Sequence, residues 1–253
     1  MANYSGRDGS AYVGTVAATG VLTLTGQPLD TQTVTIGSKV YTFQTVLTNV
    51  DGNVLIGASA SASLDNLIAA ITLGLGAGTL YATATTLHPT VTAAAGAGDT
   101  MDATAQAKGS GGNSLATTET LTNGSWGNAT LTGGAEASIG ELLLWELTLD
   151  DELIEDTVKG DSLRTFVPDL AGGRATITAH LDYGDTAQAS LVDAINSGAP
   201  PLIACKLRIA GTTKEFLVNG FATGYSTGSP EGGARDRITF SVALASLPTV
   251  TWT

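Results

Sequence analysis

Few residues of this chain have types and a spacing that could support catalysis. Asp150 and Glu155 could serve as the paired carboxylates of a hydrolase, and the acidic run that ends at Asp156 could bind a cation such as calcium. The run lacks the Asp-x-Asp-x-Asp-Gly spacing of a calcium-binding loop, however. A solvated acidic turn is therefore the favoured interpretation, and we predict no metal site.

The other reactive side chains are scarce and scattered. His88 and His180 are the only histidines and lie in different predicted domains, so a histidine-based metal site or catalytic triad is disfavoured. Each histidine is expected at a surface or sheet edge. Cys205 lies on the apolar side of a predicted strand, where it would pack as a core thiol. The glycine-rich segments 74–78 and 109–112 lack the rest of a phosphate-binding loop and predict turns. We predict no enzyme activity, no catalytic residue and no cofactor.

Composition narrows the possible partners. The 253 residues are 43% hydrophobic, enough for a packed core, whereas only 13% are charged. Acidic residues outnumber basic ones 23 to 11, so the surface repels phosphate and specific nucleic-acid binding is disfavoured. The N-terminus lacks the charged and apolar regions of a secretion signal, and no apolar run reaches the length of a membrane span. We expect synthesis in a cytoplasm and no membrane insertion.

The elements that would position any site are mainly strands. Residues 174–182 alternate as a strand, Asp185 offers an N-cap with Gln188 at the capping-box spacing, and a short amphipathic helix follows until Gly198. Further alternating or apolar segments predict strands at residues 142–149, 202–209, 216–223 and 237–247. The C-terminal half is therefore predicted to be mainly β, with one helix covering a sheet.

Residues 18–136 differ in composition and are predicted to form a separate, inserted α+β or β-rich domain. Residues 18–135 are rich in Thr, Ala and Gly and contain two basic and six acidic residues, a net charge of −4 that leaves −8 of the total −12 for the remainder. Gly37-Ser38 predicts a hairpin turn, and Ser63 could cap a helix that ends at Gly74. The strands expected here are residues 33–36, 39–45, 90–94, 100–107, 115–121 and 129–132.

The order of elements over residues 1–17 and 137–253 resembles the tail tube (major tail) proteins of long-tailed bacteriophages. The resemblance rests on an extended, otherwise unstructured N-terminal arm with a short strand at residues 11–16, Trp145-Glu-Leu-Thr-Leu, the acidic turn, a loop over residues 158–172, and residues 179–195, followed by 202–209, 219–225 and 240–242. It implies a β-sandwich or barrel of packed sheets with one flanking helix. It also implies hexameric rings that stack into a tube around a tape-measure protein and later the passing DNA, with tail terminator and baseplate or tip proteins at the ends. The expected location is the virion tail.

The same resemblance suggests which residues join neighbouring subunits and rings. The candidates are Tyr4 and Tyr12 in the arm, and Lys159, Arg164 and Phe166 in the loop, with Phe166 as an apolar plug and Arg164 as a charge partner. An ordinary surface loop is the alternative. The acidic wall of such a tube would let DNA slide without specific binding.

The inserted domain departs from that pattern. Its segments 34–43 and 54–60 resemble a module of phage virion structural proteins. Several copies would obstruct a channel, so we expect the domain to face outward, which leaves little room for a sheath and favours a non-contractile tail. Two alternatives stay open: a virion surface module that contacts host glycans through this domain, and the hydrolase with Asp150 and Glu155.

Overall fold

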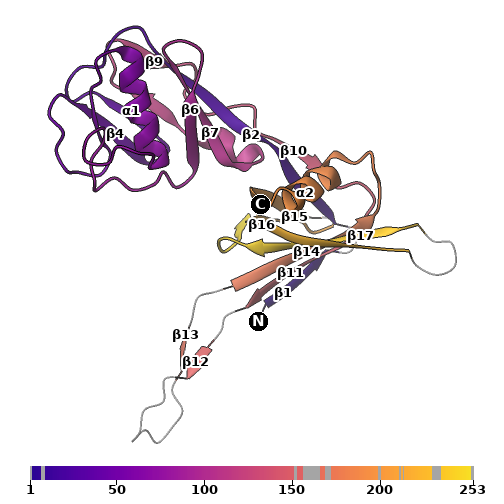
Figure 1. Ribbon diagram of the computed structural model, residues 1–253. Coiled ribbons are helices and arrows are strands. Elements are labelled where there is room, and N and C mark those ends of the chain that lie inside the picture. The colour runs from indigo at the N-terminus through magenta and orange to yellow at the C-terminus, as the bar shows by residue number, and fades with distance from the viewer. Residues whose placement is uncertain are drawn as a thin grey trace, which may run out of the picture. The chain divides into compact units, whose positions relative to one another are not determined.

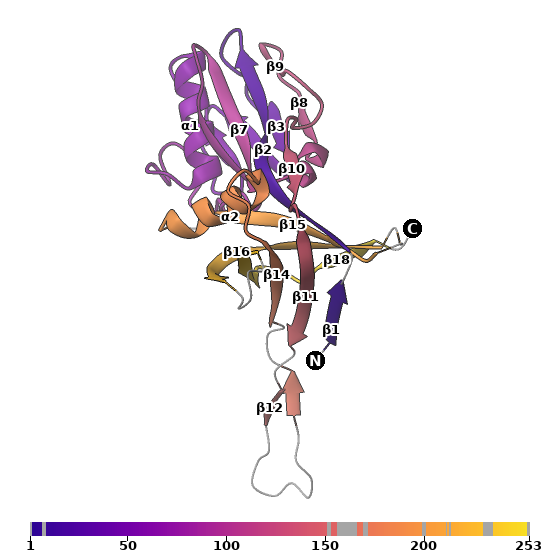
Figure 2. The same cartoon turned by 90° about the vertical axis from the view of Figure 1, so that its right-hand side faces the viewer.

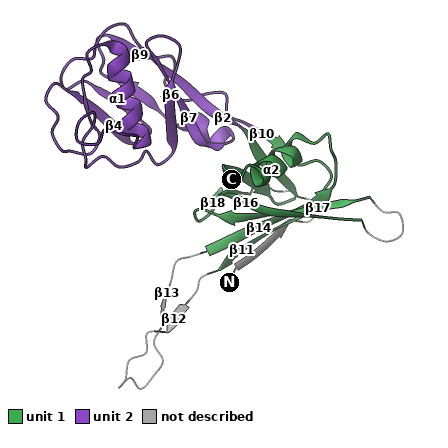
Figure 3. Ribbon diagram, viewed as in Figure 1, with its two compact units in different colours: residues 1–15, 136–253 green, residues 16–135 purple. Residues whose placement is uncertain are grey.

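The fold is mainly β and divides into two compact units. A computed structural model describes residues 2–6, 9–150, 153–155, 166–168, 172–198, 201–210, 212, 214–229 and 235–251 (Figure 1). Unit 1 comprises Met1–Thr15 and Glu136–Thr253, and unit 2 comprises Val16–Ala135 (Figure 3). The predicted mainly β fold with a large antiparallel sheet and one flanking helix in the C-terminal half is confirmed.

Unit 1 contains one continuous antiparallel path of strands, with β1 beside β11 at its end (Figure 2). β10 (Ala135–Ser138) also pairs with β2, β18 (Thr249–Thr251) pairs with β16, and β12 (Leu153–Glu155) pairs with β13 (Phe166–Pro168). The path runs β1 (Ala2–Gly6), β11 (Leu142–Asp150), β14 (Gly172–His180), β17 (Arg237–Leu244), β16 (Glu215–Gly228), β15 (Leu202–Arg208) and the first residues of β2 (Ser10–Leu24).

Alternation along these strands builds the core of unit 1. Alternate residues are buried from Ala175 to Ala179 in β14 and from Ile238 to Val242 in β17, as predicted from the period of two. Trp145 is fully buried, packs edge-on against Phe216 and donates its indole N–H to the Arg208 carbonyl at 3.2 Å. A buried tryptophan with a satisfied N–H ties together β11, β15 and β16.

Helix α2 (Thr186–Asn196) buries Ala187, Leu191 and Ala194 against this core. The predicted Asp185 cap is confirmed, because its carboxylate accepts from the backbone N–H groups of Ala187 and Gln188 at 2.8 and 3.1 Å. The predicted capping box is not formed, because the Gln188 side chain does not bond back to the N-cap residue. Gln188 is only 2% exposed, and a buried amide needs hydrogen-bond partners within the protein. Its amide donates to the His180 carbonyl and accepts from the Asp182 N–H.

Unit 2 contains two groups of strands and one helix. β2 continues into the order β2-β7-β6, with β9 also paired to β2, and a second sheet has the order β5-β4-β3-β8. The predicted hairpin is confirmed, since Val34, Ile36, Tyr41 and Phe43 are all fully buried. The elements are β3 (Thr33–Ile36), β4 (Lys39–Gln44), β5 (Asn53–Leu55), α1 (Ala60–Thr72), β6 (Val91–Ala95), β7 (Thr100–Lys108), η1 (Ser110–Ser114), β8 (Thr117–Glu119) and β9 (Gly124–Trp126).

Two predictions in unit 2 were wrong in detail. Helix α1 is capped by Ser59, whose hydroxyl accepts from the Ala62 N–H at 3.1 Å. Ser63 is instead fully buried one turn later, where its hydroxyl donates to the Ser59 carbonyl and accepts from the Gly57 N–H. Residues 129–132 form only isolated bridges, Thr130 with Ala116 and Thr132 with Thr19, and the strand found in this region is β9, which pairs with β2.

The two connections between the units run on neighbouring strands. The chain enters unit 2 along β2 and returns along β10, which pairs with β2. Just beyond β10, the Ile139 N–H donates to the Ala11 carbonyl at 2.8 Å. Unit 2 is therefore inserted through two adjacent chain segments.

Candidate functional site

The N-terminal candidates lie on strands. Tyr4 is in β1, opposite Leu147 of β11, and Tyr12 is in β2, opposite Lys206 of β15. The expectation of an unstructured arm is wrong for residues 2–6, which pair with β11, whereas the short strand expected at residues 11–16 is confirmed as part of β2. β1 is the last strand of the path, so its outer edge is the side on which a further strand could add.

Tyr12 belongs to a polar cluster on unit 1. The guanidinium carbon of Arg208 lies 5.9 Å from the centre of the Tyr12 ring, within cation–π range. Arg208 also pairs with Glu215, and its Nε donates to the carboxylate at 2.9 Å. The half-buried Tyr12 ring is thus positioned by β15 and β16 as well as by its own strand.

The predicted ring-contact loop lies in the chain between two paired positions of the sheet, Asp150 of β11 and Gly172 of β14. Within it the structure describes two short strands, β12 and β13, which pair with each other. Phe166 begins β13 and pairs with Glu155 of β12, which corrects the expectation of a loop without secondary structure. Lys159 and Arg164 lie outside the described residues.

The residues considered for catalysis lie on different strands, Asp150 at the end of β11 and Glu155 at the end of β12. Asp150 is exposed at the end of β11, and within the described ranges no group of three His, Cys, Asp or Glu side chains could hold a metal ion. Cys205 is fully buried, as predicted, and desolvation together with the nearby Glu136 charge raises its thiol pKa to about 12. At neutral pH this thiol is not a nucleophile. Among the described helices, none is long and apolar enough to cross a membrane.

His88 corrects a prediction, because it is 1% exposed rather than at a surface or sheet edge. Its Nδ1 accepts from the N–H groups of Thr90 and Val91 at 3.2 and 3.0 Å, which assigns the proton to Nε2, 3.2 Å from the Ile36 carbonyl. Burial lowers the His88 pKa, assisted by the positive charge of Lys39. The neutral ring is a satisfied core group that stabilises unit 2.

The aromatic side chains of unit 2 are all internal. Tyr41 and Phe43 are fully buried, Tyr81 is 3% exposed and Trp126 is 9% exposed. Sugar-binding surfaces commonly offer an exposed ring for stacking, and the exposed large hydrophobic side chains of this unit, such as Val46 and Leu75, are aliphatic. Unit 2 therefore offers no exposed aromatic ring that would support the glycan-binding alternative.

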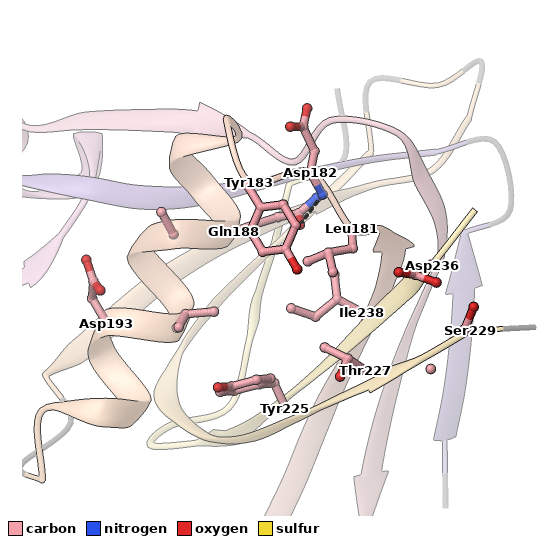
Figure 4. Close-up of a pocket in the computed structure, with 13 residues that line it drawn as sticks. Leu181, Asp182, Tyr183, Gln188, Asp193, Tyr225, Thr227, Ser229, Asp236 and Ile238 are labelled. Atoms are coloured by element: carbon pink, nitrogen blue, oxygen red, sulfur yellow. Dashed lines mark hydrogen bonds between the residues drawn. The ribbon is translucent and has the colours of Figure 1, made fainter.

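A cavity in unit 1 was not anticipated from the sequence. It has a volume of about 610 Å³ and lies between α2 and the ends of β16 and β17 (Figure 4). Two tyrosines line it, Tyr183 at 93% exposure and Tyr225 at 43%. The one sequence signal for this cavity was Tyr183, an exposed tyrosine in the turn before α2. The strand that completes the cavity, β16, lies more than thirty positions later in the chain and could not be connected with it from the sequence.

Comparisons with known proteins give matches of structure alone. No family of known sequences matches the chain, and no curated protein matches it closely. Thirteen chains of solved structures are similar to this one. The tail of an empty gene transfer agent particle, refined with C6 symmetry, has 12% identity, a TM-score of 0.37, and coverage of 48% of this chain and 88% of that one.

Two further similar structures are a gene transfer agent virion and a tail tube. The virion of a native gene transfer agent particle has 12% identity, a TM-score of 0.38, and coverage of 46% of this chain and 88% of that one. The SPP1 tail tube has 11% identity, a TM-score of 0.39, and coverage of 48% and 72%. The solved structures similar to this chain thus include tail tube proteins, the class that its sequence resembles.

Proposed function

We propose that this chain is a structural virion protein that self-assembles into stacked hexameric rings, forming the tail tube of a phage. The tube is the conduit for genome delivery and encloses the tape-measure protein before DNA passes. Tail terminator and baseplate or tip proteins close its ends. The chain is made in the cytoplasm of the host bacterium, resides in the virion tail, and needs no cofactor or catalytic residue.

The observation that supports this most directly is the construction of unit 1. Its sheet ends in the short edge strand β1, and the separate strand pair β12–β13 lies in the chain between the neighbouring strands β11 and β14. An edge strand offers unpaired backbone groups to a second copy, and a strand pair outside the main sheet can contact a neighbour. In the proposed tube, Tyr4 on the edge strand serves the first kind of contact, Tyr12 on the internal strand β2 contributes through its half-buried side chain, and Lys159, Arg164 and Phe166 serve the second kind.

Charge supports the conduit role. Unit 1 carries most of the chain's net negative charge, by the sequence count given above, and a negative wall repels phosphate at every step of the duplex. DNA would therefore pass without being held by many counterion-releasing contacts. We further propose that unit 2 faces outward and that the tail is non-contractile, because a domain of this size in the channel would block the duplex.

The test is electron microscopy of the purified, concentrated full chain, together with its size-exclusion profile. Stacked rings with a central channel are expected, with extra density on the outside. Phe166→Asp should abolish stacking by placing a charge in an apolar contact, whereas Leu75→Asp, at a side chain of unit 2 that is 96% exposed, should leave tubes intact.

A deletion variant tests the placement of the insert. Replacing residues 16–135 by a short Gly-Ser linker joins two neighbouring segments of unit 1, so the sheet should still form. Tubes with the same channel and a smooth exterior are expected. Density of unit 2 inside the channel of full-length tubes would refute the outward placement, and a chain that stays monomeric with every initiating partner supplied would refute the tube itself.

A further inference from the structure

The cavity of unit 1 has a floor of aliphatic side chains and walls of mixed character. Leu181 and Ile238 form the floor, and the Leu181 N–H donates to the Asp236 carbonyl at 2.9 Å, which joins the turn before α2 to the start of β17. Tyr225 also packs near the buried Phe240, with ring centres 6.3 Å apart. One wall is thus anchored to the hydrophobic core.

Two carboxylates stand on opposite sides of this space. Figure 4 shows Asp193 on the helix side and Asp236 on the strand side, with the rings of Tyr183 and Tyr225 between them. Asp182 differs, because its carboxylate accepts from the Gly184 N–H at 2.8 Å and points away from the rings. Asp193 and Asp236 are therefore the acidic groups available to an occupant.

The lining contains no compensating cation among the described residues. Arg235, next in sequence to Asp236, is paired with Glu141. Both carboxylates are solvent-exposed, and their negative charge repels an anion and attracts a cation. A cation can in addition lie over the electron-rich face of a tyrosine ring.

We propose that this cavity binds an arginine or lysine side chain presented by a peptide segment of a partner protein. The volume of about 610 Å³ lies in the range of side-chain and small-ligand pockets. Its lining includes none of the residues proposed above for the ring contacts, and its test does not require a tube.

A partner other than this chain is the better source of the cation. The chain has 23 acidic residues and 11 basic ones, so it lacks the cations to neutralise its own carboxylates. In unit 1, Lys206, Arg208 and Arg235 already pair with Glu136, Glu215 and Glu141. A basic segment of another protein complements this surface and would be recognised by charge and by the rings together.

The experiment titrates the full-length protein with a short fluorescent peptide that carries two arginines between glycines, and follows fluorescence anisotropy. The double variant Asp193→Asn and Asp236→Asn should bind about tenfold more weakly, and Tyr225→Leu a few-fold more weakly. A matched control, Asp65→Asn with Asp99→Asn, makes the same change in net charge at two exposed positions of unit 2 and should bind within about twofold of the original protein.

Equal weakening in the cavity variant and the control would overturn the proposal, because binding would then follow net charge alone. Absence of binding by the original protein at low salt would overturn it as well. If the cavity variant loses self-association in size exclusion while the control keeps it, the cavity is occupied by a second copy, and the assignment to a different protein is wrong.

Discussion

Acidification should destabilise unit 2 selectively, because its buried histidine has no room for a second proton. The Nδ1 atom of His88 faces two backbone N–H groups, so a proton there would point at donors and break both hydrogen bonds. The pKa of folded His88 is lowered by burial, whereas in the unfolded chain it returns to about 6.5. The unfolded state therefore binds the proton more readily, and stability is lost as pH falls through that value.

The size of the effect follows from this difference in proton binding. If the folded ring stays neutral, the free energy of unfolding of unit 2 falls by about 1.4 kcal/mol between about pH 7.5 and about pH 5.5. For a domain of this size, that loss lowers the melting temperature by about 5 °C. Below the folded pKa both states are protonated, and the histidine makes no further contribution to the pH dependence.

Hydrogen exchange resolved by peptide measures the two units separately. Amides of α1 and β7 should lose protection over this pH range by the amount given above, and His88→Gln should remove most of the dependence. His180→Gln, in unit 1, serves as the control and should leave the change in unit 2 intact. If the His88 ring titrates at or above pH 6.5 by NMR, or if His88→Gln shows an undiminished slope, the reasoning is refuted.

Three further substitutions test local contacts by urea unfolding. Asp185→Ala removes the cap of α2 and the bond accepted from the Gly140 N–H at 2.5 Å, so unit 1 should lose about 1 to 2 kcal/mol; a change below about 0.3 kcal/mol would contradict the cap. Ser59→Ala should lower the free energy of unfolding of unit 2 by about 1 kcal/mol, because it removes the cap of α1. An unchanged free energy of unfolding would contradict Ser59 as the cap and favour a helix that begins at a later residue. Gly52→Ala should cost about 2 kcal/mol or more, because Gly52 has φ +82° and a Cβ would lie 2.2 Å from the Val40 carbonyl oxygen; an unchanged midpoint would show that this loop relaxes freely.

Elements with strong periodicity were predictable from the sequence. The alternation of Ile177, Phe240 and their neighbours identified the buried face of β14 and β17, and Asp185 identified the start of α2. These signals are local, since a strand face or an N-cap depends on residues only a few positions apart. The Ser59 cap was missed because Ser63 also precedes an apolar repeat, and only its burial decides between the two.

Features made by distant segments were not predictable in this way. His88 is neutral and buried because backbone groups of Ile36, Thr90 and Val91 satisfy its ring, and the first of these is supplied by another strand. The cavity likewise forms only when Tyr183, in the turn before α2, and Tyr225, in β16, line the same space. For the candidate contacts, the sequence suggested the residues, and the structure supplies the strand pairing of Tyr4, Tyr12 and Phe166.

Because the single cysteine is buried in unit 1, thiol labelling can measure how often this unit opens. Cys205 is inaccessible and held as a thiol, so a thiol-specific reagent reacts with it only when β15 opens. The rate of labelling then measures that opening directly, without an added probe. Conversely, a cysteine introduced at an exposed position would be modified alone in the native protein, which allows a single dye or crosslinker to be placed on each copy of the chain.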